Sequence, residues 1–158
     1  MRIIINKVTQ RPPHAPISER AIEERLAGSG ARFTSGRRQV VAALSGADGP
    51  RSAAELHEEM GGEVPVSSVY RSLAVLEQAG VVEPHHGARG LTRYEMAEWL
   101  AGHHHHLVCE SCGGVEDIEL PKQLEVELER LVGKVSGLSS FSASGHALEV
   151  DGRCERCR

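Results

Sequence analysis

Residues 103–112 read HHHHLVCESC, and the two cysteines of this stretch form a C-x2-C pair. The other two cysteines of the chain, Cys154 and Cys157, repeat the same spacing. Four thiolates suit a structural zinc ion, because a four-cysteine shell is tetrahedral and leaves no position for a substrate. Two disulfides are the alternative. We disfavour them because no segment resembles a secretory signal, and paired C-x2-C motifs in a cytosolic protein indicate metal.

The four consecutive histidines predict two further metal sites. The apolar residues after them indicate a strand over residues 102–109, in which side chains alternate between two faces. His103 and His105 then share one face, while His104 and His106 share the other. A solvated polar run is the alternative. A purification tag is disfavoured because the run lies within the chain and leads directly into a thiol pair.

Composition limits the class of protein. A chain of 158 residues with 3% aromatic side chains forms one or two small domains with an aliphatic core. The net charge of -4 arises in residues 101–158, where cations can offset it, since residues 1–100 carry 12 basic and 12 acidic side chains. No apolar run approaches the ~20 residues of a membrane helix, so we expect a cytoplasmic protein without a membrane partner.

The first hundred residues predict a winged helix. Residues 1–16 have no helical or strand period and predict a flexible arm. Apolar spacing and caps predict four helices, starting at Ser18, at Thr34 or Ser35, at Ser52 and at Ser67. Strands over 81–83 and 92–96 around a turn at 87–90 form the wing. The last two helices fit a helix-turn-helix, which would offer Ser68, Tyr70 and Arg71 to a DNA groove.

The remaining residues predict a small α/β unit. A strand over 115–120 leads to Pro121, which suits the first position of a helix. This helix would bury Leu124, Leu128 and Leu131 and end at Gly133. A returning strand over 141–150 would carry His146.

Several motifs together resemble the ferric uptake regulator (Fur) superfamily of metal-dependent transcriptional repressors. They are GARFTSGR (30–37), SSVYRSLAVLEQAGVV (67–82), RYE (93–95), HHHHLVCESCG (103–113) and CERC (154–157). The resemblance implies an α+β fold, with a winged helix-turn-helix domain over 17–99 and a hinge over 100–102. A small α/β dimerisation domain with the four-cysteine zinc site would occupy 103–158. It also implies a homodimer that binds double-stranded operator DNA, with a divalent metal as co-repressor at metal homeostasis genes.

The resemblance also implies roles for individual residues. Tyr70 and Arg71 would contact DNA from the recognition helix, and Arg32 would enter the minor groove. Structural zinc would be held by Cys109, Cys112, Cys154 and Cys157. A regulatory site between the domains would use Glu95, His104, His106 and Glu119, with Glu83 matching in kind an acid of zinc-sensing relatives. A second site would use His103, His105, His146 and Glu125, with Glu127 as the alternative carboxylate.

The sensed metal stays open at this stage. Iron-type relatives usually supply a histidine where this chain has Pro50, and zinc-type relatives often supply a cysteine where it has Ala97. Imidazole and carboxylate suit several metals, so we expect Zn2+ or Fe2+, with Ni2+ or Mn2+ also compatible. A peroxide-sensing repressor and a zinc-stapled protein adaptor without DNA binding are the alternatives. We expect no enzyme, because the chain lacks the H-E-x-x-H pattern of zinc hydrolases.

Overall fold

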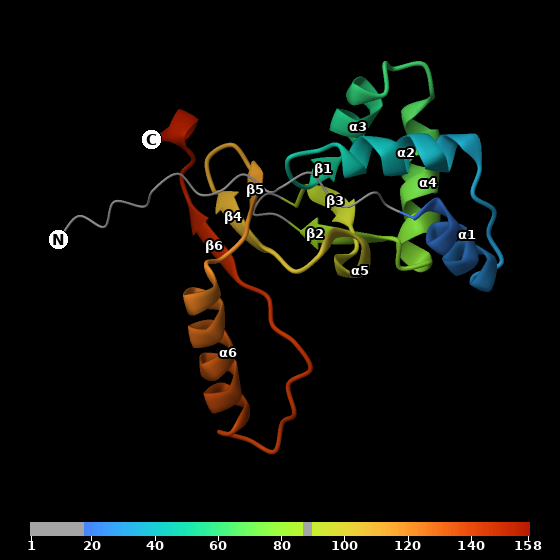
Figure 1. Ribbon diagram of the computed structural model, residues 1–158. Coiled ribbons are helices and arrows are strands. Elements are labelled where there is room, and N and C mark those ends of the chain that lie inside the picture. Colours follow the sequence, from blue (N-terminus) through green and yellow to red (C-terminus); the bar gives the residue numbers. More distant parts are fainter. Residues whose placement is uncertain (1–17, 87–89) are drawn as a thin grey trace.

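The computed structural model describes residues 18–86 and 90–158. The arm expected at 1–16 and most of the turn expected at 87–90 therefore lie outside the described residues. Within them the chain forms a larger N-terminal unit of helices and a three-stranded sheet, and a smaller unit of three strands and one long helix (Figure 1). None of the described helices is long and apolar enough to cross a membrane.

The N-terminal unit contains the hydrophobic core. Its four main helices are α1 (Glu19–Gly28), α2 (Ser35–Ser45), α3 (Ala53–Glu59) and α4 (Val66–Gln78). Apolar side chains spaced three or four residues apart place one face of each helix inside. The buried set includes Ile22, Leu26, Val40, Leu44, Leu56, Val69, Leu73 and Leu76. The helical part of the winged-helix prediction is confirmed.

The helix starts agree with the predicted caps except at α4. The Ser18 side chain accepts a hydrogen bond from the Ala21 amide, and Ser52 forms a reciprocal capping box with Glu55. The prediction that Ser67 caps the recognition helix is wrong. Pro65 occupies the cap position, and α4 begins one residue later. A proline suits this place because the first helical turn needs no intrahelical N–H donor there.

A three-stranded antiparallel sheet forms the wing. Strand β3 (Thr92–Met96) lies between β2 (Val82–His86) and β1 (Arg51–Ser52). The two-residue β1 was not predicted, because so short a segment carries no periodic signal. A short helix, α5 (Glu98–Ala101), follows β3 and includes the first two residues of the hinge expected over 100–102. Trp99 holds α5 against the N-terminal unit by donating from its indole nitrogen to the Gly80 carbonyl at 2.7 Å.

A buried ion pair joins the wing to α3. The Arg93 side chain is buried and donates to both carboxylate oxygens of Glu55, at 2.7 and 3.0 Å. Burial of Glu55 opposes ionisation, but hydrogen bonds from Ser52 and Arg93 outweigh it and lower the pKa of Glu55. The pair fixes the position of β3, the strand that also carries Glu95.

We expect Glu55→Gln to lower the free energy of unfolding by about 1–3 kcal/mol, because the buried Arg93 loses its counter-charge. This value is below that of a fully buried pair, since the Glu55 side chain is 39% exposed. Because the pKa of Glu55 is lowered in the folded state, the ionised carboxylate stabilises the fold at pH values above its unfolded pKa near 4.5. This stabilisation is lost as the pH falls through the folded pKa. Urea unfolding at pH 7 and pH 4 should therefore show a smaller pH effect in the variant than in the wild type.

Glu58→Gln on the exposed face of α3 is the matched control for this experiment. It should leave both the stability and its pH dependence unchanged. Equal effects of the two substitutions would contradict the role of the Glu55–Arg93 pair.

The smaller unit is a mixed sheet beside a long helix. Strand β4 (His105–Cys109) pairs antiparallel with β5 (Val115–Ile118) and parallel with β6 (Glu149–Gly152). Helix α6 (Lys122–Ser136) connects β5 to the return segment, and a short 3-10 helix, Glu155–Cys157, follows β6. The α+β fold class is confirmed.

Several boundaries in this unit differ from the prediction. Strand β4 begins at His105 and not at residue 102, and β5 ends at Ile118 and not at residue 120. Pro121 caps α6 from outside, and the helix continues past Gly133 to Ser136. The return strand begins only at Glu149, so His146 lies before it. The ladder starts where Glu149 pairs with His106, the second residue of β4.

Helix α6 buries none of its residues within the chain, although its sequence is amphipathic. It extends away from both sheets (Figure 1). Leu131 and Val135 on the helix, and Leu138 and Phe141 after it, are between 56 and 87% exposed. The expected burial of the leucine stripe is therefore not seen within one chain. An exposed apolar surface of this kind marks an interaction site.

Candidate metal centres and DNA-facing surface

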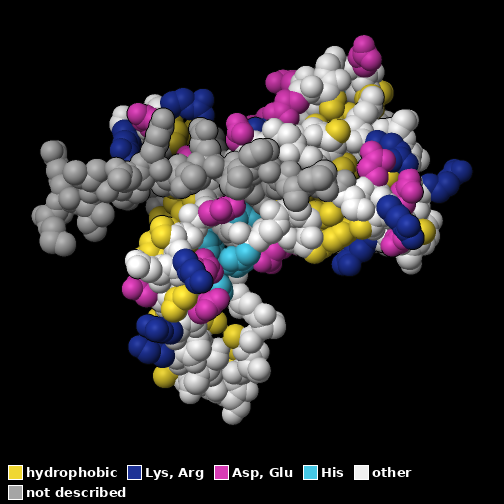
Figure 2. Space-filling model, in the orientation of Figure 1, with side chains coloured by type: hydrophobic (Ala, Val, Ile, Leu, Met, Phe, Trp, Pro, Cys, Tyr) yellow, Lys and Arg dark blue, Asp and Glu magenta, His cyan; other side chains and the backbone are white. Residues whose placement is uncertain are grey.

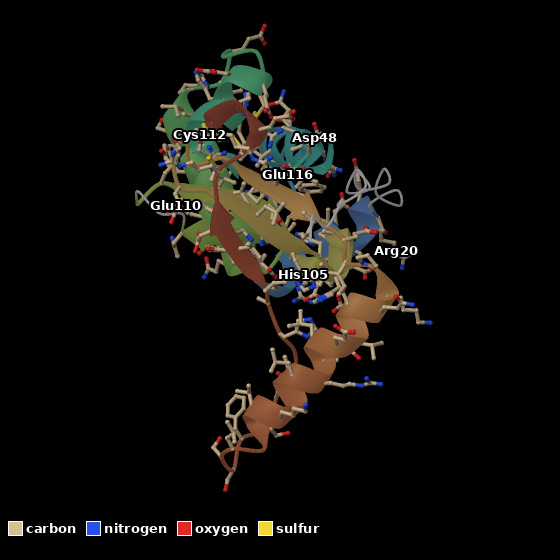
Figure 3. All side chains as sticks on the ribbon, turned by 90° about the vertical axis from the view of Figure 1, so that its left-hand side faces the viewer. Arg20, Asp48, His105, Glu110, Cys112 and Glu116 are labelled. Atoms are coloured by element: carbon tan, nitrogen blue, oxygen red, sulfur yellow. The ribbon has the colours of Figure 1, made fainter. Side chains whose placement is uncertain are left out.

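The four cysteines converge from the two ends of the smaller unit's sequence. Their ligand atoms lie within 4.8 Å of one another. Cys109 ends β4, and Gly113, with φ +70°, allows the tight turn that brings Cys112 back toward it. The Cys154 amide donates to the Cys109 sulfur at 3.4 Å. Figure 3 shows Cys112 and His105 toward opposite ends of the small sheet, so the thiols are separate from the histidines.

The surroundings of the thiols favour a bound cation. Hydrogen bonds from the backbone amides of Cys154 and Cys112 lower the pKa of Cys109 to about 6. Interaction with the Cys154 side chain raises the pKa of Cys157 to about 11. One thiolate is therefore favoured near neutral pH, and further negative charge on the group requires a cation. This donor set fits zinc in a closed tetrahedral site.

A second cluster forms where α6 begins. His103, His105, His146 and Glu125 place their ligand atoms within 4.8 Å of one another. Glu125 accepts from His105 at 3.1 Å and from His146 at 2.9 Å, and the contact with His105 contributes most to lowering its pKa. These are the four residues that the family resemblance implied for a second site. Glu127 is exposed and does not belong to the cluster.

Glu98 supports this second cluster from α5. Its carboxylate lies 2.6 Å from Nδ1 of His103, which leaves Nε2 of the same ring facing Glu125 at 3.2 Å. A carboxylate behind a histidine is the usual outer partner of a metal ligand, because it fixes the tautomer and the ring orientation. The sequence reasoning did not assign Glu98.

A third cluster lies between the two units. Glu95 on β3 meets His104 and His106, which belong to the smaller unit, and Asp117 on β5 completes the group within 4.8 Å. Glu95 Oε2 is 2.9 Å from His104 Nε2 and 3.2 Å from His106 Nε2. Figure 2 shows the histidines gathered between the two units. The two units thus share one polar cluster.

The charges of this inter-domain cluster stabilise one another. Burial raises the pKa of Glu95, but hydrogen bonds from His104, His106 and His85 outweigh it and lower that pKa strongly. Burial lowers the pKa of His104, yet its contact with Glu95 gives a net increase. Nδ1 of His104 lies 2.9 Å from the Gly102 carbonyl, so Nε2 faces the carboxylate. This orientation suits an imidazole that binds a metal through Nε2.

Two residues assigned to the regulatory site are not in the cluster. Glu119 lies beyond the end of β5 and is exposed, whereas Asp117 lies opposite His106 in the β4–β5 ladder. Glu83 pairs with Glu95 across β2 and β3 but is exposed, at the rim of the cleft that the histidines line. Register, which the sequence does not reveal, decides between Asp117 and Glu119.

The two units also touch beside Asp117. A Cβ atom added to Gly49 would lie 2.8 Å from the Val115 carbonyl oxygen and 3.5 Å from Asp117 Oδ1. Figure 3 shows the neighbouring Asp48 and Glu116 in the same region. Only a glycine permits this approach, so the loop before β1 rests directly on β5.

The residues assigned to DNA contact lie on the N-terminal unit. Tyr70 and Arg71 are exposed on α4, and Arg71 donates to the Ser68 hydroxyl at 2.9 Å. Arg32 is exposed in the loop before α2. The exposed half of α4 is thus free of the core, while its other face is held by Val69 and Leu73.

Comparison with known proteins agrees with this architecture. Residues 28–150 match the Ferric uptake regulator family. The chain belongs to this family. The Ferric uptake regulation protein of Neisseria meningitidis is 35% identical over 100 residues, or 63% of this chain, which spans 65% of that relative's length. The Zinc uptake regulation protein of Mycobacterium tuberculosis is 32% identical over 136 residues, or 84% of this chain and 99% of the relative.

Solved structures of the ferric uptake regulator family share the fold. The Helicobacter pylori regulator Fur, whose structure reveals three functional metal binding sites, has a TM-score of 0.67 and 25% identity over 87% of this chain and 92% of that one. The Vibrio cholerae Fur has a TM-score of 0.65 and 26% identity over 84% and 98%. The resemblance drawn from the sequence is confirmed. Members of the family are transcription regulators.

Proposed function

We propose that the protein is a metal-responsive repressor that binds operator DNA as a homodimer in the cytoplasm. The observation that carries the proposal is the shared cluster, in which Glu95 of the wing meets His104 and His106 of the smaller unit. Any ligand that requires these side chains together favours one arrangement of the two units. A structural zinc ion at the four cysteines would hold the smaller unit together.

A bound divalent metal would supply the positive charge that holds these carboxylates and imidazoles together. Glu95 transmits this closure to the winged helix, because the Arg93–Glu55 pair anchors its strand to α3. The exposed face of α6 supports dimerisation, since its apolar side chains have no partner helix within the described chain. Closure in a dimer would fix the separation of the two α4 helices, which must match half-sites about one turn of DNA apart.

The size of the effect follows from this coupling. An allosteric coupling of about 1–3 kcal/mol changes DNA affinity roughly 5- to 150-fold. The metal enters in place of protons, because ligand histidines must be neutral. Relatives named for ferric uptake, zinc uptake and a peroxide operon all resemble this chain, so the proposal covers the divalent metal as a class.

The test is DNA binding by the chelator-treated protein with its cysteine zinc restored. The protein is mixed with DNA from upstream of its own gene, and buffered Zn2+, Fe2+, Ni2+ and Mn2+ are added in turn. A random-fragment selection under the same conditions follows. We expect specific binding to appear with at least one metal. Absence of specific binding with every metal would overturn the repressor proposal and favour a protein adaptor.

Arg71→Ala is expected to weaken operator binding by about 1–3 kcal/mol, because a recognition-helix arginine contributes that much to base readout. Metal content and dimerisation should not change. Arg20→Ala on α1, whose side chain is 87% exposed, is the matched control and should bind like the wild type. Unchanged operator affinity in Arg71→Ala would remove α4 from the DNA interface.

A further inference from the structure

His85 contacts the inter-domain cluster, although no sequence pattern assigned it a role. It lies on β2, and its side chain is 24% exposed. Its Nε2 is 2.6 Å from Glu95 Oε1, and its ring centroid is 4.4 Å from that of His106. The Glu95 carboxylate therefore faces three imidazoles, with Oε1 toward His85 and Oε2 toward the other two.

The sheet holds His85 in this place. In the β2–β3 ladder His85 pairs with Arg93, and Glu83 pairs with Glu95, so His85 and Glu95 are diagonal neighbours on one face. Strand β2 follows α4 after only three residues, of which Val81 is fully buried. A contact at His85 is thus connected through a short, packed segment to the recognition helix.

We propose, building on the function above, that His85 is a metal ligand of the inter-domain site and sets its preference for Zn2+ over Mn2+. Without His85 the cluster offers two imidazoles and two carboxylates, from His104, His106, Glu95 and Asp117. With it, three imidazoles face the shared Glu95 carboxylate. Imidazole suits zinc, iron and nickel, whereas carboxylate oxygens suit manganese, so a third ring shifts the selectivity of the site.

The same ligand ties the bound ion directly to both strands of the wing. Glu95 reaches the site from β3 and His85 from β2, while His104 and His106 reach it from the smaller unit. Metal binding through His85 therefore fixes the hairpin that follows the recognition helix, in addition to the strand anchored by Arg93.

The experiment compares Zn2+ and Mn2+ affinity of full-length His85→Ala and His85→Gln, by competition with chelators. A His146→Ala background weakens the second cluster, and Co2+ absorption reports the ligand set of the inter-domain site. His85→Gln can still donate to Glu95 but offers no imidazole nitrogen. His86→Ala, exposed on the same strand, is the matched control.

Loss of an outer-shell partner lowers metal affinity roughly 10- to 100-fold. We expect the Zn2+ affinity of both His85 variants to fall by at least this factor. Mn2+ affinity should fall much less, the Co2+ spectrum should change, and His86→Ala should alter neither. An equal loss of Zn2+ and Mn2+ affinity with an unchanged Co2+ spectrum would overturn the proposal. These readouts need no DNA, so a failure of operator binding in the wild type would be seen separately.

Discussion

Cys154→Ser is expected to unfold the smaller unit and abolish the proposed dimer. Structural zinc contributes on the order of 10 kcal/mol to the folding of small metal domains. The smaller unit has little else to replace it, because its buried apolar side chains are few, chiefly Val108, Cys109 and Ile118, and α6 buries none. Zinc content, circular dichroism and sedimentation of the purified variant should show loss of one zinc, loss of structure and monomeric or aggregated protein.

The winged helix should survive this substitution, since its core is separate. His104→Ala is the contrasting control, because it removes an imidazole from a different cluster and should leave zinc at the cysteines and the dimer intact. A Cys154→Ser protein that is dimeric and folded but merely unresponsive to metal would contradict the structural role of the four cysteines.

The grouping of histidines followed from the expected alternation, although β4 begins only at His105 and the first two histidines precede it. Alternation along residues 103–106 assigns His103 with His105 and His104 with His106, and the two pairs enter different clusters. The cysteine spacing likewise required no knowledge of the fold. The helices of the N-terminal unit followed from their apolar period, which the buried faces of α1, α2 and α4 reproduce.

The residues near Glu95 that were missed depend on register between strands, which a local pattern does not contain. Asp117 faces the cluster because it lies opposite His106, and His85 does so because it is diagonal to Glu95. The adjacent His85 and His86 at the edge of the wing were the available signal, but only the ladder separates the inward ring from the outward one. The exposure of the apolar face of α6 could not be predicted either, since a helical period does not distinguish a core face from an interface with another chain.

Glu95→Gln is expected to remove metal-dependent DNA binding while the protein stays folded and dimeric. The carboxylate faces His85, His104 and His106, and a neutral amide binds a divalent cation far less well than a carboxylate does. The metal-induced gain in operator affinity that we propose for the wild type, roughly 5- to 150-fold, should be lost. Titration of operator DNA with and without metal measures this gain, and the Co2+ spectrum of the site should change.

Gly49→Ala tests the closure of the two units without changing any side chain of the metal site. The added Cβ would lie 2.8 Å from the Val115 carbonyl, so the closed arrangement should be disfavoured by about 1–3 kcal/mol. By linkage, metal affinity and the gain in DNA affinity should both decrease, yet the saturated Co2+ spectrum should stay that of the wild type. Gly28→Ala, with nothing within 4 Å of its Cβ, is the control. A normal DNA response in Gly49→Ala would mean that metal acts on the recognition helix without closing this contact.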